Sequence, residues 1–397
     1  MNRYGGPVFD CDTHVNETVE NFNRHLPEPA RSALDIRRVE EPGGRWPYYV
    51  HGVRSDIIAE MTRIGDRVPR PGSLKEFLHG IKTGNPDFVF IDPTPEIRTR
   101  EGRLRWMDAG GIETALLYPG ECVTLWPYIR DTRLKDAFFH AFNQYLDEDW
   151  GFNRDGRLYA CPLMTLDNLD NAIAEVEWCI ARGARLLLMP VGPVDGKSPA
   201  HPHFDPFWAR VNEARMTVVF HIGESTGTQP LLRAWGEALT PARHLASAWF
   251  WMNAYGEQPL IHMLSSIVFH NFFARFPHIR IISAENGAEF VPKFLVKMDK
   301  SRGMAKGGTW PCGALKERPS RIFLEHVGVV AYPEDDVASI VSQVGSADFL
   351  LAGTDFPHPE GVAGPQAFVE GACAGVGEAD LAKIMYGNAR RLLRLRT

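Results

Sequence analysis

The sequence predicts an α/β protein folded as a (β/α)8 TIM barrel with two long insertions. Two observations support this prediction. Short apolar runs, typical of parallel strands buried on both faces, alternate with helical patterns along most of the chain. Eight such runs can be counted, the number that this barrel requires, although a doubly wound sheet would give a similar pattern. A barrel with insertions can span 397 residues as one domain, so we expect a single domain over 1–397.

The predicted strands are spread over the whole chain. The first is PVFDCD (7–12), which lies almost at the N-terminus. The other seven are IETALLYP (112–119), LYACPLM (158–164), RLLLMP (185–190), TVVFHIG (217–223), IRIISAENG (279–287), VGVVAYP (327–333) and DFLLAGTDFP (348–357).

Helical patterns separate these strands. REGRLRWMDAGG (100–111) ends in glycines, which commonly terminate helices. DNLDNAIAEVEWCIARGA (167–184) has helical spacing, with an aspartate at its start and a glycine near its end. Further predicted helices are FDPFWARVNEARM (204–216), EFVPKFLVKMDKS (289–301) and EDDVASIVSQVG (334–345).

Two connections are too long to be simple crossovers between strands. Residues 15–105 follow the first strand and include EEPGGRWPYYVHG (40–52), which predicts a small antiparallel excursion. Residues 224–260 follow the fifth strand and include AWFWMNAY (248–255). Long loops at the carboxyl ends of barrel strands build pockets and lids, so we expect both insertions to do so.

The insertions are rich in aromatic residues, among them Trp46 and Trp251. Such residues suit an apolar or aromatic acyl substrate, but they could equally pack the insertions onto the barrel. The AWFWMNAY segment could also form the contact of a homo-oligomer, and we expect a dimer.

Composition excludes several classes of protein. A net charge of -6 without a basic cluster gives no reason to expect nucleic-acid binding, so the expected partner is a small-molecule substrate. No stretch approaches the roughly 20 apolar residues of a membrane helix. The N-terminal residues lack the apolar core of a signal peptide, and the six cysteines form no CxxC pair. These features predict a cytoplasmic protein with reduced thiols.

Polar side chains follow several of the predicted strands at their carboxyl ends, where active sites of such barrels lie. They are Asp12 and His14 after the first strand, His221 after the fifth, Glu285 after the sixth and Asp355 after the eighth. Asp12 and His14 are two residues apart in an extended segment, so both side chains face the barrel mouth.

Each of these residues also has an ordinary structural explanation. A single histidine such as His221 is often only hydrogen-bonded, and Asp355 could cap the next helix. Their joint occurrence at one end of a barrel favours a metal site, because imidazole and carboxylate suit zinc, manganese and ferrous iron. Asp10 has the same parity one layer deeper, where it would orient the ligands or close the barrel floor.

Several motifs together resemble the amidohydrolase superfamily. They are D-x-H at the first strand, FHIGES at the fifth, RFPHIRIISAENGA at the sixth, GTDFPHPEG at the eighth and YGNARRLLRL near the end. The resemblance is to the amidohydrolase-related branch, which contains aminocarboxymuconate-semialdehyde decarboxylase and related aromatic-acid decarboxylases. It implies a metal-binding barrel in which Asp12, His14, His221 and Asp355 hold a divalent ion.

The chain departs from the common superfamily pattern at three places. Asp12 replaces the first histidine of the usual His-x-His, and Glu285 replaces a histidine after the sixth strand. No lysine ends the fourth strand, so we expect one metal ion rather than a lysine-bridged pair. Zinc is the first choice, manganese and iron stay open, and a second ion near Glu285 is a less favoured alternative.

These residues suggest hydrolysis of an ester, thioester or amide as the first choice of reaction. A metal can lower the pKa of bound water to about 7, with Asp355 carrying the proton and Glu285 assisting. The alternative is non-oxidative decarboxylation of an aromatic or unsaturated acid, with Arg45, Arg54 or Arg98 as a possible carboxylate anchor. His358 could approach either site from its loop. A barrel that binds metal without catalysis is the third possibility.

Overall fold

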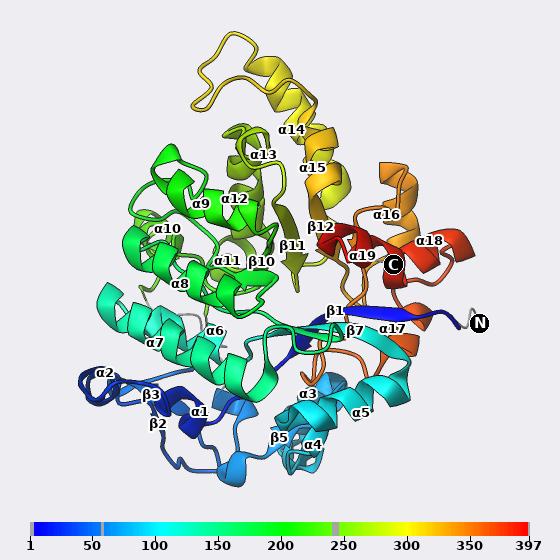
Figure 1. Ribbon diagram of the computed structural model, residues 1–397. Helices are drawn as coiled ribbons and strands as arrows, with labels where there is room; N and C mark the ends of the chain where they lie inside the picture. Colours follow the sequence, from blue (N-terminus) through cyan, green and yellow to red (C-terminus); the bar gives the residue numbers. More distant parts are fainter. Residues whose placement is uncertain (1–3, 57–58, 240–245, 396–397) are drawn as a thin grey trace.

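The computed structural model describes residues 4–56, 59–239 and 246–395 (Figure 1). In this part of the chain the main fold has eight parallel strands, arranged as two arcs. The first arc has the order β1 (Val8–His14), β7 (Ile112–Tyr118) and β8 (Leu158–Ala160). The second has the order β13 (Leu350–Leu351), β12 (Val327–Val330), β11 (Arg280–Ala284), β10 (Thr217–His221) and β9 (Leu186–Leu188).

The two arcs contact each other at both of their edges. An isolated parallel bridge joins Leu163, after β8, to Leu188 of β9. At the opposite edge the amide of Cys11 in β1 donates to Ala352 O at 2.9 Å, directly after β13. The amide of Asp355 donates to Asp12 O at 2.7 Å in the same seam. The α/β class predicted from the sequence is confirmed.

The predicted helices are all present with bounds close to those expected. They are α5 (Arg100–Gly110), α8 (Leu169–Ala181), α9 (Asp205–Glu213), α14 (Val291–Met304) and α16 (Val337–Val344). The start of α5 is set by Thr99, whose hydroxyl accepts from the amide of Gly102 at 3.1 Å. Its end is set by Gly111, which takes the left-handed conformation with φ 68°.

Further helices surround the strands (Figure 1). They are α6 (Cys122–Leu125), α7 (Thr132–Tyr145), α12 (Glu257–Phe269), α13 (Phe272–Arg275), α15 (Pro319–His326), α17 (Pro365–Glu370), α18 (Glu378–Ala382) and α19 (Asn388–Leu393). None of the helices in the described residues has the length and apolar character needed to cross a membrane.

The core explains why the strands read as unbroken apolar runs. Every residue of β1 and β10 is buried, and β7 exposes only Glu113. Large side chains from the helices, such as Phe142 and Trp208, are buried in the same hydrophobic core as the strand residues. A polar residue in such a strand is therefore costly unless it has partners, which draws attention to the polar residues at the strand ends.

The segment between β1 and β7 carries two small antiparallel sheets. One joins β2 (Arg37–Arg38), β3 (Tyr48–Val50) and β4 (Val53–Arg54), which confirms the predicted antiparallel excursion. The other pairs β5 (Val68–Pro69) with β6 (Phe90–Ile91). The helices of this segment are α1 (Val19–Asn23), α2 (Glu28–Leu34), α3 (Leu74–Thr83) and α4 (Pro95–Arg98). In Figure 1 this segment lies at the bottom of the molecule, below β1 and β7.

The segment after β10 contains α10 (Thr228–Trp235) and α11 (Ala248–Asn253). Its apolar residues divide between two environments. Phe250 is buried in a small cluster with Leu232 and Ala254, whereas Met252 is 74% exposed. The segment therefore has its own apolar packing as well as an exposed apolar side chain.

Candidate metal centre

The last residues of β1 supply two side chains to one point. Asp12 and His14 are both buried, and His14 Nε2 lies 3.1 Å from Asp12 Oδ1. The other ring nitrogen of His14, Nδ1, lies 2.9 Å from the carbonyl oxygen of Pro119. A carbonyl oxygen can only accept, so this contact places the proton of a neutral His14 on Nδ1 and leaves Nε2 as a lone pair.

His221 at the end of β10 repeats this arrangement. Its Nδ1 lies 3.0 Å from the carbonyl oxygen of Ile222, and its Nε2 lies 3.2 Å from Nε2 of His14. The same tautomer argument leaves both facing Nε2 atoms as acceptors when the rings are neutral. Two lone pairs so close together repel unless a cation lies beside them.

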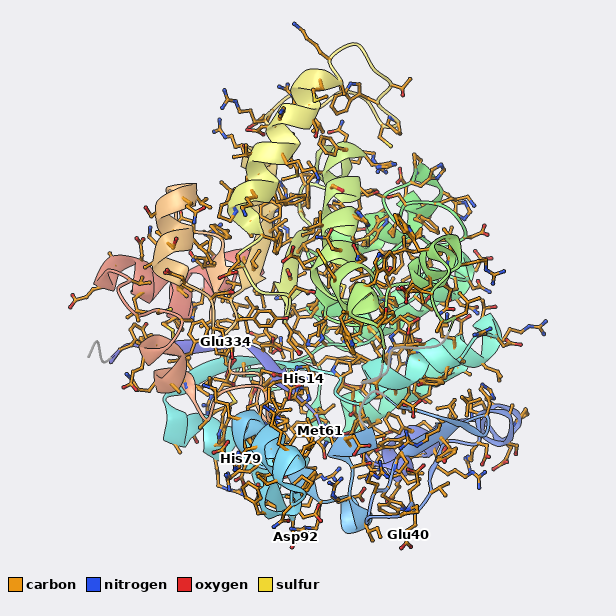
Figure 2. The ribbon with its side chains drawn as sticks, turned by 180° about the vertical axis from the view of Figure 1, so that it is seen from behind. His14, Glu40, Met61, His79, Asp92 and Glu334 are labelled. Carbon is orange, nitrogen blue, oxygen red and sulfur yellow. The ribbon has the colours of Figure 1, made fainter. Side chains whose placement is uncertain are left out.

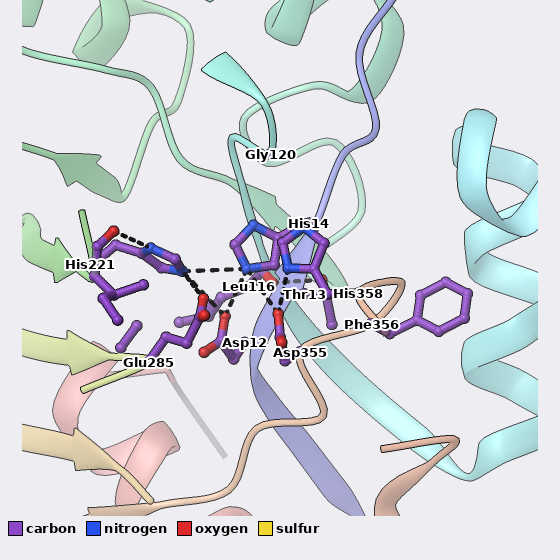
Figure 3. A network of polar contacts seen from close by, with 12 residues as sticks. Asp12, Thr13, His14, Leu116, Gly120, His221, Glu285, Asp355, Phe356 and His358 are labelled. Carbon is purple, nitrogen blue, oxygen red and sulfur yellow. Dashed lines mark hydrogen bonds and ion pairs between the residues drawn. The ribbon is translucent and has the colours of Figure 1, made fainter. Parts of the chain in front are cut away.

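Two carboxylates complete the cluster (Figure 3). Asp355 Oδ1 lies 3.3 Å from Nε2 of His14, and Glu285 Oε2 lies 3.1 Å from Nε2 of His221. Both residues have left-handed backbone, with φ 56° at Asp355 and 52° at Glu285. Such conformations are unfavourable for non-glycine residues and concentrate at functional sites, where the surrounding structure holds them.

The donor set fits a divalent metal ion. Ligand atoms of Asp12, His14 and His221 lie within 4.8 Å of one another, as do those of His14, Glu285, Asp355 and His358. Imidazole nitrogens and carboxylate oxygens suit zinc, manganese and iron. The residues expected to bind metal therefore converge, and Glu285 lies beside them at a distance that also allows it to hold an ion.

His358 approaches the cluster as its loop position suggested. Its ring stacks on His14 with 4.1 Å between centroids, and its Nδ1 lies 2.7 Å from Asp355 Oδ1. Burial opposes protonation of His358, but the Asp355 carboxylate outweighs it and raises the pKa of His358 to about 10. Burial opposes ionisation of Asp355, but the charge of His358 and the hydrogen bond that His358 donates lower the pKa of Asp355 well below the usual range.

Asp10 lies beneath the cluster, one layer deeper than Asp12. It accepts hydrogen bonds from Thr354 N at 3.0 Å, Thr354 Oγ1 at 2.6 Å and Asp12 N at 3.2 Å. Burial raises the pKa of Asp10 to about 7, against the effect of these hydrogen bonds. Asp10 thus ties β1 to the segment that carries Asp355, and so fixes the spacing of two candidate ligands.

A cavity of about 290 Å³ opens onto the cluster. Its apolar lining consists of Met61, Val68, Pro69, Val123, Ile222, Pro357 and Pro359, and its aromatic lining of Trp251 and Tyr255. Asn16, Thr62, Glu121, Thr124 and Glu360 add polar groups to the lining beyond the cluster. Figure 2 shows Met61 and His14 on neighbouring parts of the molecule. Both long segments therefore contribute to the walls.

The two tryptophans expected near the substrate behave differently. Trp251 lines the cavity, whereas Trp46 does not and lies 5.4 Å from the guanidinium carbon of Arg38. Trp46 as a substrate contact stays a prediction that the lining of this cavity does not support. Its ring packs over a buried cation within the segment after β1, which the local sequence does not reveal.

The three arginines considered as substrate anchors are occupied elsewhere. Arg45 pairs with Glu60 at 2.6 Å, and Arg54 pairs with Glu41 at 2.6 Å. Arg98 donates to the carbonyl oxygen of Asn16 at 2.7 Å. Among the described residues no arginine or lysine lines the cavity.

Three residues near the cluster escaped the sequence analysis. Glu121 and Asn16 line the cavity, and the buried Arg103 donates to the carbonyl oxygen of His14 at 2.7 Å. Glu121 lies just beyond the carboxyl end of β7, so inspection of every strand end would have found it. Arg103 lies inside a helix, and only its contact in three dimensions identifies it.

Comparison with known proteins identifies the family. The model of a family described as Amidohydrolase matches residues 9–395. The chain belongs to this amidohydrolase family. A search of curated proteins found no match.

Solved structures agree with this family. An amidohydrolase of Mycobacterium avium subsp. paratuberculosis is 28% identical, with a TM-score of 0.82 and 100% of both chains covered. A 2,6-dihydroxybenzoate decarboxylase from Rhizobium is 22% identical, with a TM-score of 0.57 over 75% of this chain and 89% of that one. A dihydroxybenzoic acid decarboxylase from Polaromonas, solved with manganese and 2-nitroresorcinol, is 19% identical, with a TM-score of 0.57 over 82% of this chain and 95% of that one. The latter two show similarity of fold alone.

Proposed function

We propose that this member of the amidohydrolase family is a metal-dependent, non-oxidative decarboxylase of small aromatic or unsaturated carboxylic acids. The observation that carries the proposal is the cavity of about 290 Å³, which has mostly apolar walls and opens directly onto the acceptor cluster. This volume is at the small end of ligand pockets, which suits a single-ring acid better than a bulky acyl ester. The activities named for the two similar decarboxylases support the same reading.

In this scheme Asp12, His14, His221 and Asp355 would hold the divalent ion, with Glu285 beside it. The ion, when bound, would supply positive charge for the substrate carboxylate. Apolar walls would keep water away from the reacting carbon. Manganese replaces zinc as our first choice because the Polaromonas enzyme was solved with bound manganese.

The reaction exchanges carbon dioxide for a proton on one carbon atom. The bond between that carbon and the carboxylate breaks, its electron pair stays on the carbon, and a proton then binds there. His358, whose pKa is raised to about 10, supplies this proton, and Asp355, 2.7 Å from its Nδ1, is the proposed carrier that passes it on. His358 holds Asp355 in place through the contact of 2.7 Å.

On the sequence, hydrolysis is the first choice because Glu285 adds a second carboxylate near the metal, which suits the handling of water better than the shielding of a dry site. In the structure Glu285 Oε2 lies 3.1 Å from Nε2 of His221, within the cluster. A carboxylate at this position is placed to hold the ion rather than to act as a separate base. The reason for preferring hydrolysis is thereby removed, and decarboxylation becomes the first choice.

Activity assays on the manganese-loaded protein test the proposal. A panel of hydroxybenzoic acids and a panel of acyl esters and thioesters are incubated separately, and released carbon dioxide and free acid are measured. We expect carbon dioxide from at least one acid and none with Asp355→Asn. Asp336→Asn is the matched control, because Asp336 is exposed and only caps α16. Ester cleavage without decarboxylation would reverse the assignment.

We infer further that the two arcs close into one (β/α)8 barrel, forming a single domain. The bridge between Leu163 and Leu188 and the hydrogen bonds between β1 and the segment after β13 support closure. We also propose a cytoplasmic homodimer. The exposed Met252 of α11 and Trp235 of α10, which are 74% and 66% exposed, support a contact between copies there.

A further inference from the structure

We propose that Glu121 selects substrates that carry a hydrogen-bond donor, a hydroxyl or amino group, in addition to the carboxylate held at the metal centre. This inference deepens the proposed function and rests on it for the identity of the reacting group. It assigns to the cavity a second recognition point, which fixes how the substrate ring is oriented.

Glu121 follows β7 and reaches the cavity with a side chain that is 15% exposed. Two neighbours contact its carboxylate. Asn16 Nδ2 donates to Oε1 at 3.0 Å, and the hydroxyl of Tyr48, which donates its one proton to the carbonyl oxygen of Glu17 at 2.9 Å, lies 3.3 Å from Oε2. An ionised carboxylate can accept about four hydrogen bonds, so these contacts leave acceptor capacity for a ligand.

A buried cation lies behind this carboxylate. Arg38 NH2 lies 3.9 Å from Glu121 Oε1, and its guanidinium packs over the ring of Tyr48 at 4.2 Å. The Arg38 side chain is only 5% exposed. Burial raises the pKa of Glu121, and the charges of Arg38 and Arg98 oppose that rise. The cation thus favours the ionised, accepting form.

The support itself is buried and hydrogen-bonded. Tyr48 is fully buried in β3, and its hydroxyl lies 2.9 Å from the carbonyl oxygen of Glu17. The sheet of β2, β3 and β4 therefore has a role beyond covering the strands, because it carries both Arg38 and Tyr48 to the rear of Glu121. A rigid acceptor loses little entropy on binding and discriminates more sharply than a mobile one.

Other polar groups in the wall are less suited to this task. The hydroxyl of Thr62 donates to Ala59 O at 2.9 Å, and that of Thr124 donates to Glu121 O at 2.7 Å. Glu360 lines the cavity but is exposed, so water competes for it. Among the described residues, Glu121 and Glu360 are the carboxylates that line the cavity outside the metal cluster, and of the two Glu121 is shielded from solvent.

A site built to accept a hydrogen bond rejects analogues that lack the donor, because its buried acceptor is then left unpaired. For a hydrogen bond to a charged group we expect a preference of about 10- to 100-fold. The preference applies to one ring position, the one that faces Glu121 when the carboxylate is at the metal centre.

The test uses 2-hydroxybenzoates that carry a hydroxyl, amino or methoxy group at ring position 3, 4 or 5. Their dissociation constants for the manganese-loaded full chain are measured by quenching of tryptophan fluorescence, since Trp251 lines the cavity. We expect one position at which the hydroxyl or amino compound binds about 10- to 100-fold more tightly than its methoxy counterpart. The hydroxyl and amino arms show which donor is preferred.

Three variants separate recognition from structural support. Glu121→Gln should reduce the preference to about threefold or less, since a neutral amide is a weaker acceptor than a carboxylate. Glu41→Gln is the matched control. Glu41 pairs with Arg54 in the segment between β1 and β7, which also carries Arg38 and Tyr48, and it does not line the cavity. Glu121→Asp keeps the negative charge, but its shorter side chain moves the carboxylate away from the cavity. This variant replaces Glu121→Gln in the comparison if circular dichroism shows that the glutamine variant is unfolded.

The outcomes are distinct. An unchanged preference in the Glu121 variant, or no preference at any position in the wild-type protein, overturns the inference. Loss of the preference in Glu41→Gln also overturns it, because the effect would then be a general disturbance of the segment. A preference that depends on Glu121 without release of carbon dioxide from any acid keeps the recognition role and rejects the decarboxylase proposal.

Discussion

Asp10 offers the sharpest test of how the fold holds the metal centre. It is buried and accepts from Thr354 N, Thr354 Oγ1 and Asp12 N. Asp10→Ala leaves these three donors without their partner. Each buried unsatisfied group costs about 1–3 kcal/mol, and partial relaxation brings the expected total to about 3–6 kcal/mol. Since domains are stable by only about 5–15 kcal/mol, Asp10→Ala should lower the free energy of unfolding severely.

Asp10→Asn is the matched variant. Its amide oxygen can keep the bonds from Thr354 N and Asp12 N, which both reach Oδ1. Its amide nitrogen would face Thr354 Oγ1, which can accept instead of donating. The expected cost is therefore only about 1 kcal/mol.

Urea unfolding followed by circular dichroism gives both free energies, and equilibrium dialysis gives the affinity for manganese. Metal affinity should fall about 10- to 100-fold in Asp10→Ala, because groups that orient ligands have effects of this size. Equal destabilisation by the two variants, or a loss below about 1 kcal/mol in Asp10→Ala, would refute the reasoning.

Three further predictions concern other parts of the molecule. His221→Ala should reduce the affinity for manganese by more than about 100-fold in equilibrium dialysis, since a ligand matters more than its support; unchanged affinity would remove His221 from the metal site. Phe142→Ala should lower the free energy of unfolding by about 3–5 kcal/mol in urea, because the ring is fully buried; a loss below about 1 kcal/mol would show loose packing. Burial, with the nearby Arg280, lowers the pKa of His326 to about 4. The unfolded chain therefore binds a proton at this residue below pH about 6.5, whereas the folded chain does not. The free energy of unfolding should fall by up to about 3 kcal/mol as the pH drops from about 6.5 to about 4. His326→Phe keeps the stacking on Phe273 and should flatten this part of the stability profile; an unchanged slope would contradict the assignment.

The fold was predictable to the extent that burial leaves a mark on the sequence. Strands such as Thr217–His221 are buried on both faces and appear as apolar runs. The eighth run was expected over 348–357, yet the strand covers only Leu350–Leu351. The residues after it adopt irregular backbone, including the left-handed Asp355, which propensity alone does not reveal.

The candidate site was predictable where its residues end strands. Asp12, His14 and His221 converge because parallel strands bring their carboxyl ends to one edge. Positions within the long segments were not predictable in this way. Trp46 and Tyr48 are close in sequence, and both rings pack on the guanidinium of Arg38. Of the two, Tyr48 is the one that contacts a residue of the cavity wall, Glu121, and this difference follows from tertiary packing rather than from the local sequence.

The seam between β1 and the segment after β13 has a consequence for synthesis of the protein on the ribosome. Asp12 and Asp355 are far apart in the sequence, and the hydrogen bond from the amide of Asp355 to Asp12 O joins them. The ribosome synthesises Asp12 and His14 long before Asp355. The full set of candidate ligands can therefore assemble only after the residues that follow β13 have been synthesised, and a truncated product that lacks them should bind a divalent ion more weakly.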